Sequence, residues 1–219
     1  NFIPFCEVSN MSECILVRHA QTDWNKKQIF RGRAEVELNR TGIRHAEKTS
    51  TLLAEVNADT IYTSPLKRSL VTAQILGRPH NLKPKEVKGL IDIDYGDWQG
   101  LLQEDVERDF PAIYQKWREE PDKVKFPGGE SLKDVRDRTV KVFEEALSSC
   151  NFFLLVSHRV VIKIILLHVL GLPLSSFWKV RQDPCAISRV EQAPSGLFLI
   201  SMNEGHHLYK PSKERREDF

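Results

Sequence analysis

The chain has 219 residues, with 32 basic and 30 acidic side chains and a formal net charge of +2. This length is typical of a single domain, and 41% hydrophobic with 28% charged residues is the composition of an ordinary globular protein, not a disordered or fibrous one. The balanced charge excludes a general nucleic-acid surface, although a local cluster of arginines could still bind a small anion.

The sequence offers no membrane span and no secretion signal. The most apolar run, residues 160–172, is too short to cross a bilayer and contains Lys163 and His168, so we expect a buried helix there. Residues 1–11 lack the basic start and long apolar centre of a signal peptide. The cysteines are widely spaced without a CxxC pair, which predicts free thiols and no metal site. We therefore expect a cytoplasmic protein with no membrane partner.

Short apolar runs and amphipathic segments alternate along the chain. The pattern predicts strands at 14–19, 59–65 and 151–158, helices at 41–56, 66–76, 131–147 and 159–170, an extended segment at 85–96, and a closing hairpin from 186–192 and 196–203. Thr41 is the expected N-cap of the first helix, and Ser131 with Asp134 predicts a capping box on the third. Such alternation predicts an α/β fold, a three-layer sandwich in which helices flank a mostly parallel sheet.

No shift in composition marks a linker, so we expect one domain over residues 12–208. The middle segment is helical in pattern but is cut by Pro111 and Pro121, which predicts a small helical cap inserted at about 99–130. Two segments are expected to be flexible tails: residues 1–11 and 209–219.

Polar residues recur where the predicted strands end. Arg18 and His19 end the first strand, Ser64 follows the second and leads to Arg68, and His158 ends the strand at 151–158. Open α/β sheets bind their ligands at the carboxyl ends of parallel strands. An arginine and a histidine side by side would by themselves suggest only a structural role. Their convergence with two further groups predicts a functional site.

The residue types in this cluster suit phosphoryl chemistry. Two arginines match phosphate oxygens and keep their charge near neutral pH. A neutral imidazole can attack phosphorus, and a second histidine, if protonated, can donate to the phosphoryl oxygens. An acid for the leaving group is also needed. Asp92 and Asp94 share a face if their segment is extended, and Glu130 is a third candidate.

The ordered motifs resemble a known family. The chain contains, in this order, LVRHAQTDWN, GRAEVELNRTG, SPLKRSLVTA, LIDIDYGDWQG, PGGES and LLVSHRVVIK. This set is similar to the histidine phosphatase superfamily of phosphoglycerate mutase-like proteins, over residues 14–203. The resemblance implies a phosphohistidine enzyme without metal or cofactor, in which His19 takes the phosphoryl group and Arg18, Arg68 and His158 hold it.

The resemblance also assigns two further residues. It places Asp92 at the position of the general acid/base, and it places Asn25 where the side chain reaches the phosphate. Arg31, Glu130 and Arg159 complete the candidate substrate-binding residues.

Four positions depart from the commonest family pattern: Ala20 and Arg159 replace glycines, and Gln21 and Asp92 replace glutamates. The most serious is Asp92, because one methylene less shortens the reach by roughly 1.5 Å and a misplacement of about 1 Å can cost on the order of a hundredfold in rate. Arg159 either adds positive charge to the pocket or points into solvent. The cap residues Tyr114, Trp117 and Arg118 either serve as helix packing and solvated charge or contact a ligand.

Within the family, residues 118–138 and 172–188 are similar to metal-independent phosphoserine phosphatases and related broad-specificity members. The resemblance implies hydrolysis of a small phosphorylated metabolite. Two alternatives stay open: phosphoglycerate mutase activity, and a catalytically weak phosphate-binding or regulatory module. A homodimer is one assembly that the sequence leaves open.

Overall fold

The computed structural model describes residues 11–208. The predicted tails at 1–11 and 209–219 fall outside the described residues except for Met11, as does Cys6. Within this part of the chain, six strands form one sheet in the order β3-β2-β4-β1-β5-β6. The strands are β1 (Ser12–Arg18), β2 (Thr60–Thr63), β3 (Lys85–Glu86), β4 (Phe152–Ser157), β5 (Ile187–Ala193) and β6 (Gly196–Glu204).

The sheet is parallel on one side of β1 and antiparallel on the other. β1 runs parallel to β4, β4 to β2, and β2 to β3, whereas β5 pairs antiparallel with both β1 and β6. The predicted α/β fold with a mostly parallel sheet is therefore confirmed, as is the closing hairpin. Because β1 and β4 are parallel neighbours, their carboxyl ends lie together.

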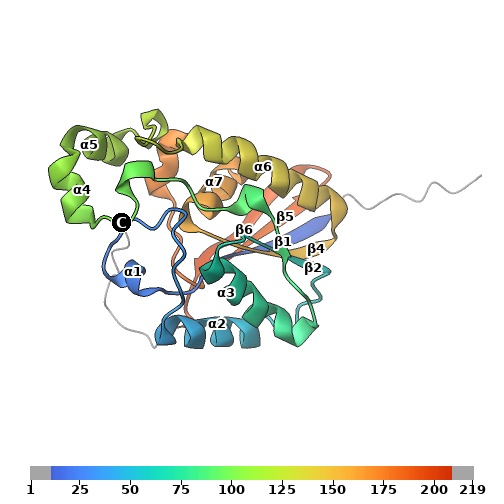
Figure 1. The fold of residues 1–219 in the computed structure, drawn as a ribbon. Coiled ribbons are helices and arrows are strands. Elements are labelled where there is room, and N and C mark those ends of the chain that lie inside the picture. Colours follow the sequence, from blue (N-terminus) through green and yellow to red (C-terminus); the bar gives the residue numbers. More distant parts are fainter. Residues whose placement is uncertain (1–10, 209–219) are drawn as a thin grey trace, which may run out of the picture.

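Helices cover both faces of the sheet (Figure 1). The helices are α1 (Asp23–Lys26), α2 (Arg40–Leu52), α3 (Lys67–Gly77), α4 (Gln103–Asp109), α5 (Pro111–Glu119), α6 (Leu132–Ser149) and α7 (Arg159–Val169). Short 3₁₀ turns include η2 (Lys88–Leu90), η3 (Gly96–Trp98), η4 (Pro121–Lys123) and η5 (Leu174–Lys179). In Figure 1, α2 and α3 lie below the sheet and α6 and α7 above it. No helix in the described part of the chain is long and apolar enough to span a membrane.

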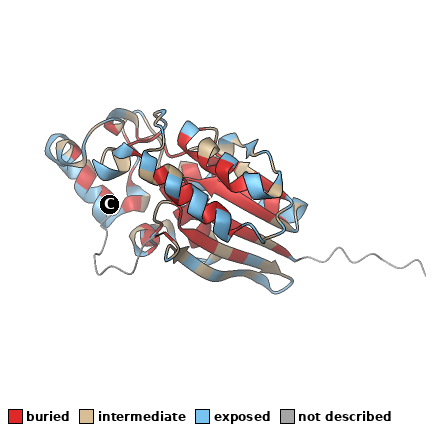
Figure 2. Ribbon diagram, turned by 90° about the horizontal axis from the view of Figure 1, so that it is seen from below, coloured by how far each residue is buried: buried red, intermediate tan, exposed pale blue. Residues whose placement is uncertain are grey.

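The alternation of side chains in β1 explains why both faces are covered. Ile15 and Val17 belong to one buried cluster with Leu76 of α3, while Leu16 belongs to a second cluster with Phe143 of α6. Successive residues of a strand point to opposite faces, so a run that is apolar throughout requires a helical layer on each side. Figure 2 shows the result, with buried residues along the strands and exposed residues on the outer surfaces of the helices.

Two local predictions are wrong. The N-cap of α2 is Asn39, whose Oδ1 accepts from the Gly42 amide at 2.8 Å, so Thr41 lies inside the helix. Residues 85–96 are extended only in β3 and continue through η2 and η3. The capping box of α6 is confirmed, because the Ser131 side chain accepts from the backbone amide of Asp134 and the Asp134 carboxylate accepts from the Ser131 amide.

The segment after η3 folds back on the domain around aromatic side chains. Trp98, Tyr114, Trp117 and Phe126 are buried, and the Trp117 and Phe126 ring centroids lie 5.1 Å apart. Tyr114 and Trp117 therefore contribute to packing between α5 and the rest of the chain, while Arg118 is exposed. That residues 99–130 form an inserted substrate cap stays a prediction.

Candidate active site

The structure brings Arg18, His19, Arg68 and His158 together in the interior. The amide of His19 donates to the Ser157 carbonyl at 2.8 Å, which continues the parallel pairing of β1 and β4. This pairing places the His19 and His158 rings with centroids 5.2 Å apart. The four residues are at most 1% exposed. Two cationic side chains and two imidazoles therefore share one water-poor site, as the strand-end pattern predicts.

His19 is held in the form that a nucleophile needs. Its Nδ1 lies 2.8 Å from the Ala20 carbonyl oxygen. A carbonyl only accepts, so Nδ1 carries the proton and the lone pair is on Nε2. Burial lowers the pKa of His19 well below its usual value, and the charges of Arg68 and Arg18 lower it further. The imidazole is therefore neutral at neutral pH, with Nε2 able to attack.

Arg68 links the anion site to the candidate acid. Its Nη1 donates to the Ala34 carbonyl at 2.8 Å, and its Nη2 donates to the Gly32 carbonyl at 2.7 Å and to Oδ2 of Asp92 at 3.1 Å. The other Asp92 oxygen, Oδ1, accepts from the Ile93 amide at 3.0 Å. The side chain of Asp92 is only 8% exposed. The shorter acid therefore does enter the site, where a buried arginine holds it.

His158 lies between Asp92 and the loop that follows β2. Its Nδ1 is 3.6 Å from Oδ2 of Asp92, and its Nε2 is 2.7 Å from Oγ of Ser64. Burial lowers the pKa of His158 well below its usual value, and the charge of Arg68 adds to this effect. The second histidine is therefore neutral in this structure, so it would have to gain its proton when an anion binds.

Arg18 is fixed by a loop that the sequence did not identify. Its Nη1 donates to the Gln182 carbonyl at 2.7 Å, and its own carbonyl accepts from the Cys185 amide at 3.0 Å. Gln182 is itself held, since its Nε2 donates to the Ala186 carbonyl at 3.0 Å. No local pattern around Gln182 indicates this function, because the contact is a backbone carbonyl far away in the sequence.

Asn25 and Arg31 are the two remaining candidates from the segment that follows β1. Oδ1 of Asn25 accepts from the Thr22 amide at 2.8 Å in the cap of α1. Its Nδ2 is buried and, like Nε of Arg68, has no hydrogen-bond partner among the described residues. Arg31 is buried, and its charge is among those that lower the pKa of His19. Arg31 therefore lies near both histidines, whereas the contact of Asn25 with a phosphate stays a prediction.

Two departures from the family pattern have local explanations. Ala20 is buried without a positive φ, and its amide donates to Oγ1 of Thr72 at 3.0 Å, so its methyl group is accommodated. Gln21 accepts from Nδ2 of Asn39 at 3.2 Å, so its side chain supports the start of α2.

Glu130 lies beside the loop that carries Asp92, and both of its oxygens are bonded. Oε1 and Oε2 accept from Arg138 at 3.1 and 3.0 Å, and Arg33 approaches Oε1 at 3.0 Å. Partial burial raises the pKa of Glu130, but the hydrogen bonds from Arg138 and the Asp94 amide outweigh it, and the net pKa is lowered. Glu130 is therefore the ionised partner of Arg138 and Arg33. Asp94 stabilises a turn, because its Oδ1 accepts from the Gly96 amide at 2.9 Å. The Asp94 carboxylate also pairs with Arg33 at 3.3 Å, whereas the Asp92 carboxylate pairs with Arg68.

Arg159 points inward. It is 5% exposed, and its Cζ lies 5.7 Å from the centre of the Trp178 ring. Burial raises the pKa of the Tyr95 hydroxyl, and the charge and hydrogen bond of Arg159 oppose this rise, as does the charge of Arg31. Asp92 also acts on the Tyr95 pKa. Arg159 therefore adds positive charge next to the site, and the solvent-exposed alternative is wrong.

Within the described residues, Cys14, Cys150 and Cys185 are free thiols. In that same part of the chain, no group of three or more histidine, cysteine, aspartate or glutamate side chains is arranged to hold a metal ion. The site thus consists of cationic side chains, two neutral imidazoles and one buried carboxylate.

Comparison with known proteins agrees with this arrangement. The family model described as "Histidine phosphatase superfamily (branch 1)" matches residues 14–205. The chain is 34% identical over 201 residues to "Phosphoserine phosphatase 1" of Hydrogenobacter thermophilus, covering 90% of this chain and 95% of the relative. It is 32% identical to a 2,3-bisphosphoglycerate-dependent phosphoglycerate mutase of Cytophaga hutchinsonii, covering 71% and 76%. A solved structure of an Entamoeba histolytica phosphoserine phosphatase variant in complex with phosphoserine superposes with a TM-score of 0.80 at 25% identity, covering 90% of this chain and all of the other.

Proposed function

The chain belongs to the histidine phosphatase superfamily and is a phosphoric monoester hydrolase; we propose that it hydrolyses a small phosphorylated metabolite through a phosphohistidine intermediate on His19. The observation that carries this proposal is the bond of Nδ1 to the Ala20 carbonyl, which leaves the Nε2 lone pair for phosphorus. Arg18 and Arg68, with His158, would hold the phosphoryl oxygens.

In the first step, Nε2 of His19 attacks phosphorus and the bond between phosphorus and the leaving oxygen breaks. A protonated Asp92 gives its proton to that oxygen, so the product leaves as a neutral alcohol. In the second step, Asp92 takes a proton from water while the water oxygen attacks phosphorus, and His19 is released with free phosphate. Nδ2 of Asn25 and Nε of Arg68 are buried donors that phosphate oxygens would satisfy.

We propose that His158 acts in its protonated form. In the ligand-free site its pKa is low because of burial and Arg68. A bound phosphate dianion opposes both effects, since a nearby negative charge favours the charged imidazole. His158 would then donate to a phosphoryl oxygen.

Phosphoserine is the first substrate to test, because proteins named as phosphoserine phosphatases are similar over 90% of this chain. We place Arg159 on the substrate side of the site, where its planar guanidinium could bind a carboxylate of the substrate while it holds Tyr95. Glu130 we place instead in the support of the loop that carries Asp92. The mutase alternative is kept because of the mutase relative. The cytoplasmic location and a homodimer stay predictions.

The test is a panel of phosphomonoesters: p-nitrophenyl phosphate, phosphoserine, phosphoethanolamine and the two phosphoglycerates, with EDTA present and a mutase assay in parallel. We expect phosphate release that EDTA does not prevent and that is lost in His19→Ala. Isomerisation of phosphoglycerate faster than its hydrolysis would support the mutase. No release from any member of the panel would support a weak phosphate-binding module instead.

A further inference from the structure

The loop that carries Asp92 is held through its backbone carbonyls. Arg138 of α6 donates through Nη1 to the carbonyls of Gly89 and Ile91 at 2.9 and 2.7 Å, and through Nη2 to the carbonyl of Asp92 at 3.1 Å. The Leu90 carbonyl accepts from Oγ of Ser157 at 2.7 Å. Four consecutive carbonyls are therefore fixed by side chains, three of them by one guanidinium.

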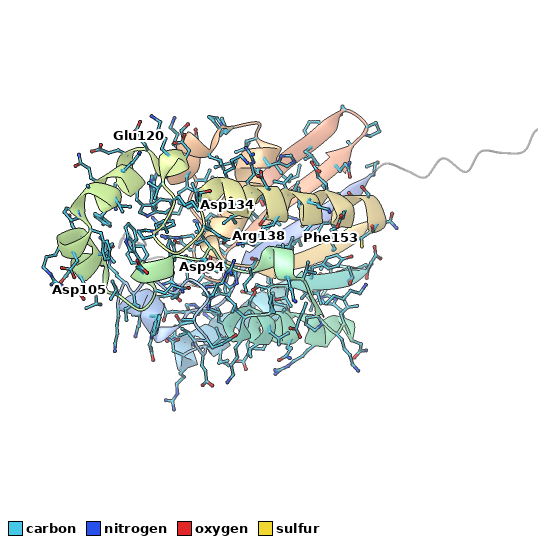
Figure 3. All side chains as sticks on the ribbon, turned by 45° about the horizontal axis from the view of Figure 1, so that its top comes forward. Asp94, Asp105, Glu120, Asp134, Arg138 and Phe153 are labelled. Carbon is cyan, nitrogen blue, oxygen red and sulfur yellow. The ribbon has the colours of Figure 1, made fainter. Side chains whose placement is uncertain are left out.

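The guanidinium of Arg138 is itself fixed. Its Nε and Nη2 donate to the two oxygens of Glu130 at 3.1 and 3.0 Å, a two-point contact that sets the plane of the group. The Glu130 carboxylate also accepts from the Asp94 amide at 3.0 Å. The Arg138–Glu130 ion pair therefore binds the backbone of the loop on both sides of the Asp92 side chain. Figure 3 labels Arg138 on α6 and Asp94 on the loop beside it.

The backbone of the Asp92 loop also packs closely against α6 and the segment that precedes it. A Cβ at Gly89 would lie 2.5 Å from Cγ2 of Val142 on α6 and 3.0 Å from the Arg138 carbonyl oxygen. A Cβ at Gly129 would collide with the carbonyl oxygen of Asp94. Glycine at these two positions lets the loop lie directly against α6 and the segment that precedes it. Gly129 and Glu130 of the PGGES motif therefore support the loop that carries Asp92.

We propose that Arg138 is a positioning residue that fixes the backbone at Asp92, so that this short acid reaches the leaving-group oxygen. The inference rests on the proposed phosphatase function with Asp92 as the acid. A side chain that is shorter by one methylene, roughly 1.5 Å, has no spare reach, so its Cα must be held closer to the substrate. One guanidinium that binds the carbonyls of residues 89, 91 and 92 restricts that Cα directly.

The experiment compares Arg138→Met and Arg138→Lys on two substrates that differ in their need for an acid. p-Nitrophenolate leaves as a stable anion, whereas the alkoxide of serine must be protonated. For Arg138→Met we expect kcat on phosphoserine to fall by about 10- to 100-fold with little change in KM, and kcat on p-nitrophenyl phosphate to fall much less. The kcat of Arg138→Lys on phosphoserine should lie between those of the wild type and Arg138→Met, because one ammonium group cannot bond three carbonyls and a carboxylate in the same plane. Arg136→Met is the matched control, since Arg136 lies on the same helix and pairs with Asp137 in solvent.

A rescue separates positioning from general destabilisation. In the Arg138→Met background, Asp92→Glu supplies the missing reach and should raise kcat on phosphoserine about tenfold over Arg138→Met alone, whereas in the wild-type background the same change should lower it. Equal losses on both substrates, or no gain from Asp92→Glu, would show that Arg138 only stabilises the fold. Wild-type protein that releases no phosphate from either substrate would instead contradict the proposed function itself.

Discussion

Replacing Asp92 by asparagine removes the carboxylate with almost no change in shape. Oδ2 accepts from Arg68 at 3.1 Å and lies 3.6 Å from Nδ1 of His158. An amide can keep the contact of Oδ1 with the Ile93 amide, but an NH₂ group in place of Oδ2 cannot accept from Arg68. The variant therefore breaks a buried ion pair and removes the proposed acid at the same time.

The cost to stability follows from the partners that remain. Breaking a buried ion pair by removing one member costs about 3–5 kcal/mol when the other charge is left without bonds. Arg68 retains the carbonyls of Gly32 and Ala34, so we expect the free energy of unfolding to fall by only about 2–3 kcal/mol. Urea denaturation followed by circular dichroism measures this change.

The cost to catalysis depends on the leaving group. A general acid contributes about 10²- to 10⁴-fold, so kcat of Asp92→Asn on phosphoserine should fall by that factor. On p-nitrophenyl phosphate the loss should be about tenfold or less, because the leaving group needs no proton. Steady-state assays on the folded variant give both values. If Asp92→Asn keeps nearly wild-type turnover on phosphoserine, Asp92 is not the acid.

Two further predictions test the charges around the site. Arg159→Met should raise the KM for phosphoserine about tenfold or more relative to the KM for phosphoethanolamine, which lacks the carboxylate. Arg118→Met is the control and should not do so, because Arg118 lies at the same Trp178 ring but is exposed. Equal effects of Arg159→Met on both substrates would exclude Arg159 from substrate recognition. Burial lowers the pKa of both His19 and His158. Below about pH 6.5 the unfolded chain therefore binds more protons than the folded chain. As the pH is lowered through this range, the free energy of unfolding should fall by up to about 1.4 kcal/mol per pH unit for each histidine. Urea titrations that show constant stability as the pH falls through this range would contradict the neutral, buried state of both rings.

Part of the site could be predicted from sequence because it depends on strands. The apolar run of β1 and that of β4 identify buried neighbours, and the rule that parallel strands present their carboxyl ends together places His19 near His158. The same logic predicted Arg68 at the start of α3. The site residues that the strands position could therefore be predicted from the sequence.

The conformation of the loop that carries Asp92 could not be predicted from the sequence, for a physical reason. Residues 91–94 alternate apolar and polar side chains, which is the period of a strand. The carbonyls of residues 90, 91 and 92 accept from Arg138 and Ser157 instead of from a neighbouring strand. Arg138 itself lies in a run of alternating charges that is typical of a solvated helix, and only the fold shows that it faces the loop. Long-range side-chain contacts with a backbone leave no local pattern.

The most direct test of the mechanism is to look for the phosphoryl group on His19. Wild-type protein mixed rapidly with phosphoserine and quenched in alkali should show one added phosphoryl group by intact mass, stable in alkali, lost in acid, and mapped to His19 by peptide analysis. The His19→Ala variant should show neither the adduct nor phosphate release. Phosphate release without any adduct in the wild type, or release that persists in His19→Ala, would contradict the account.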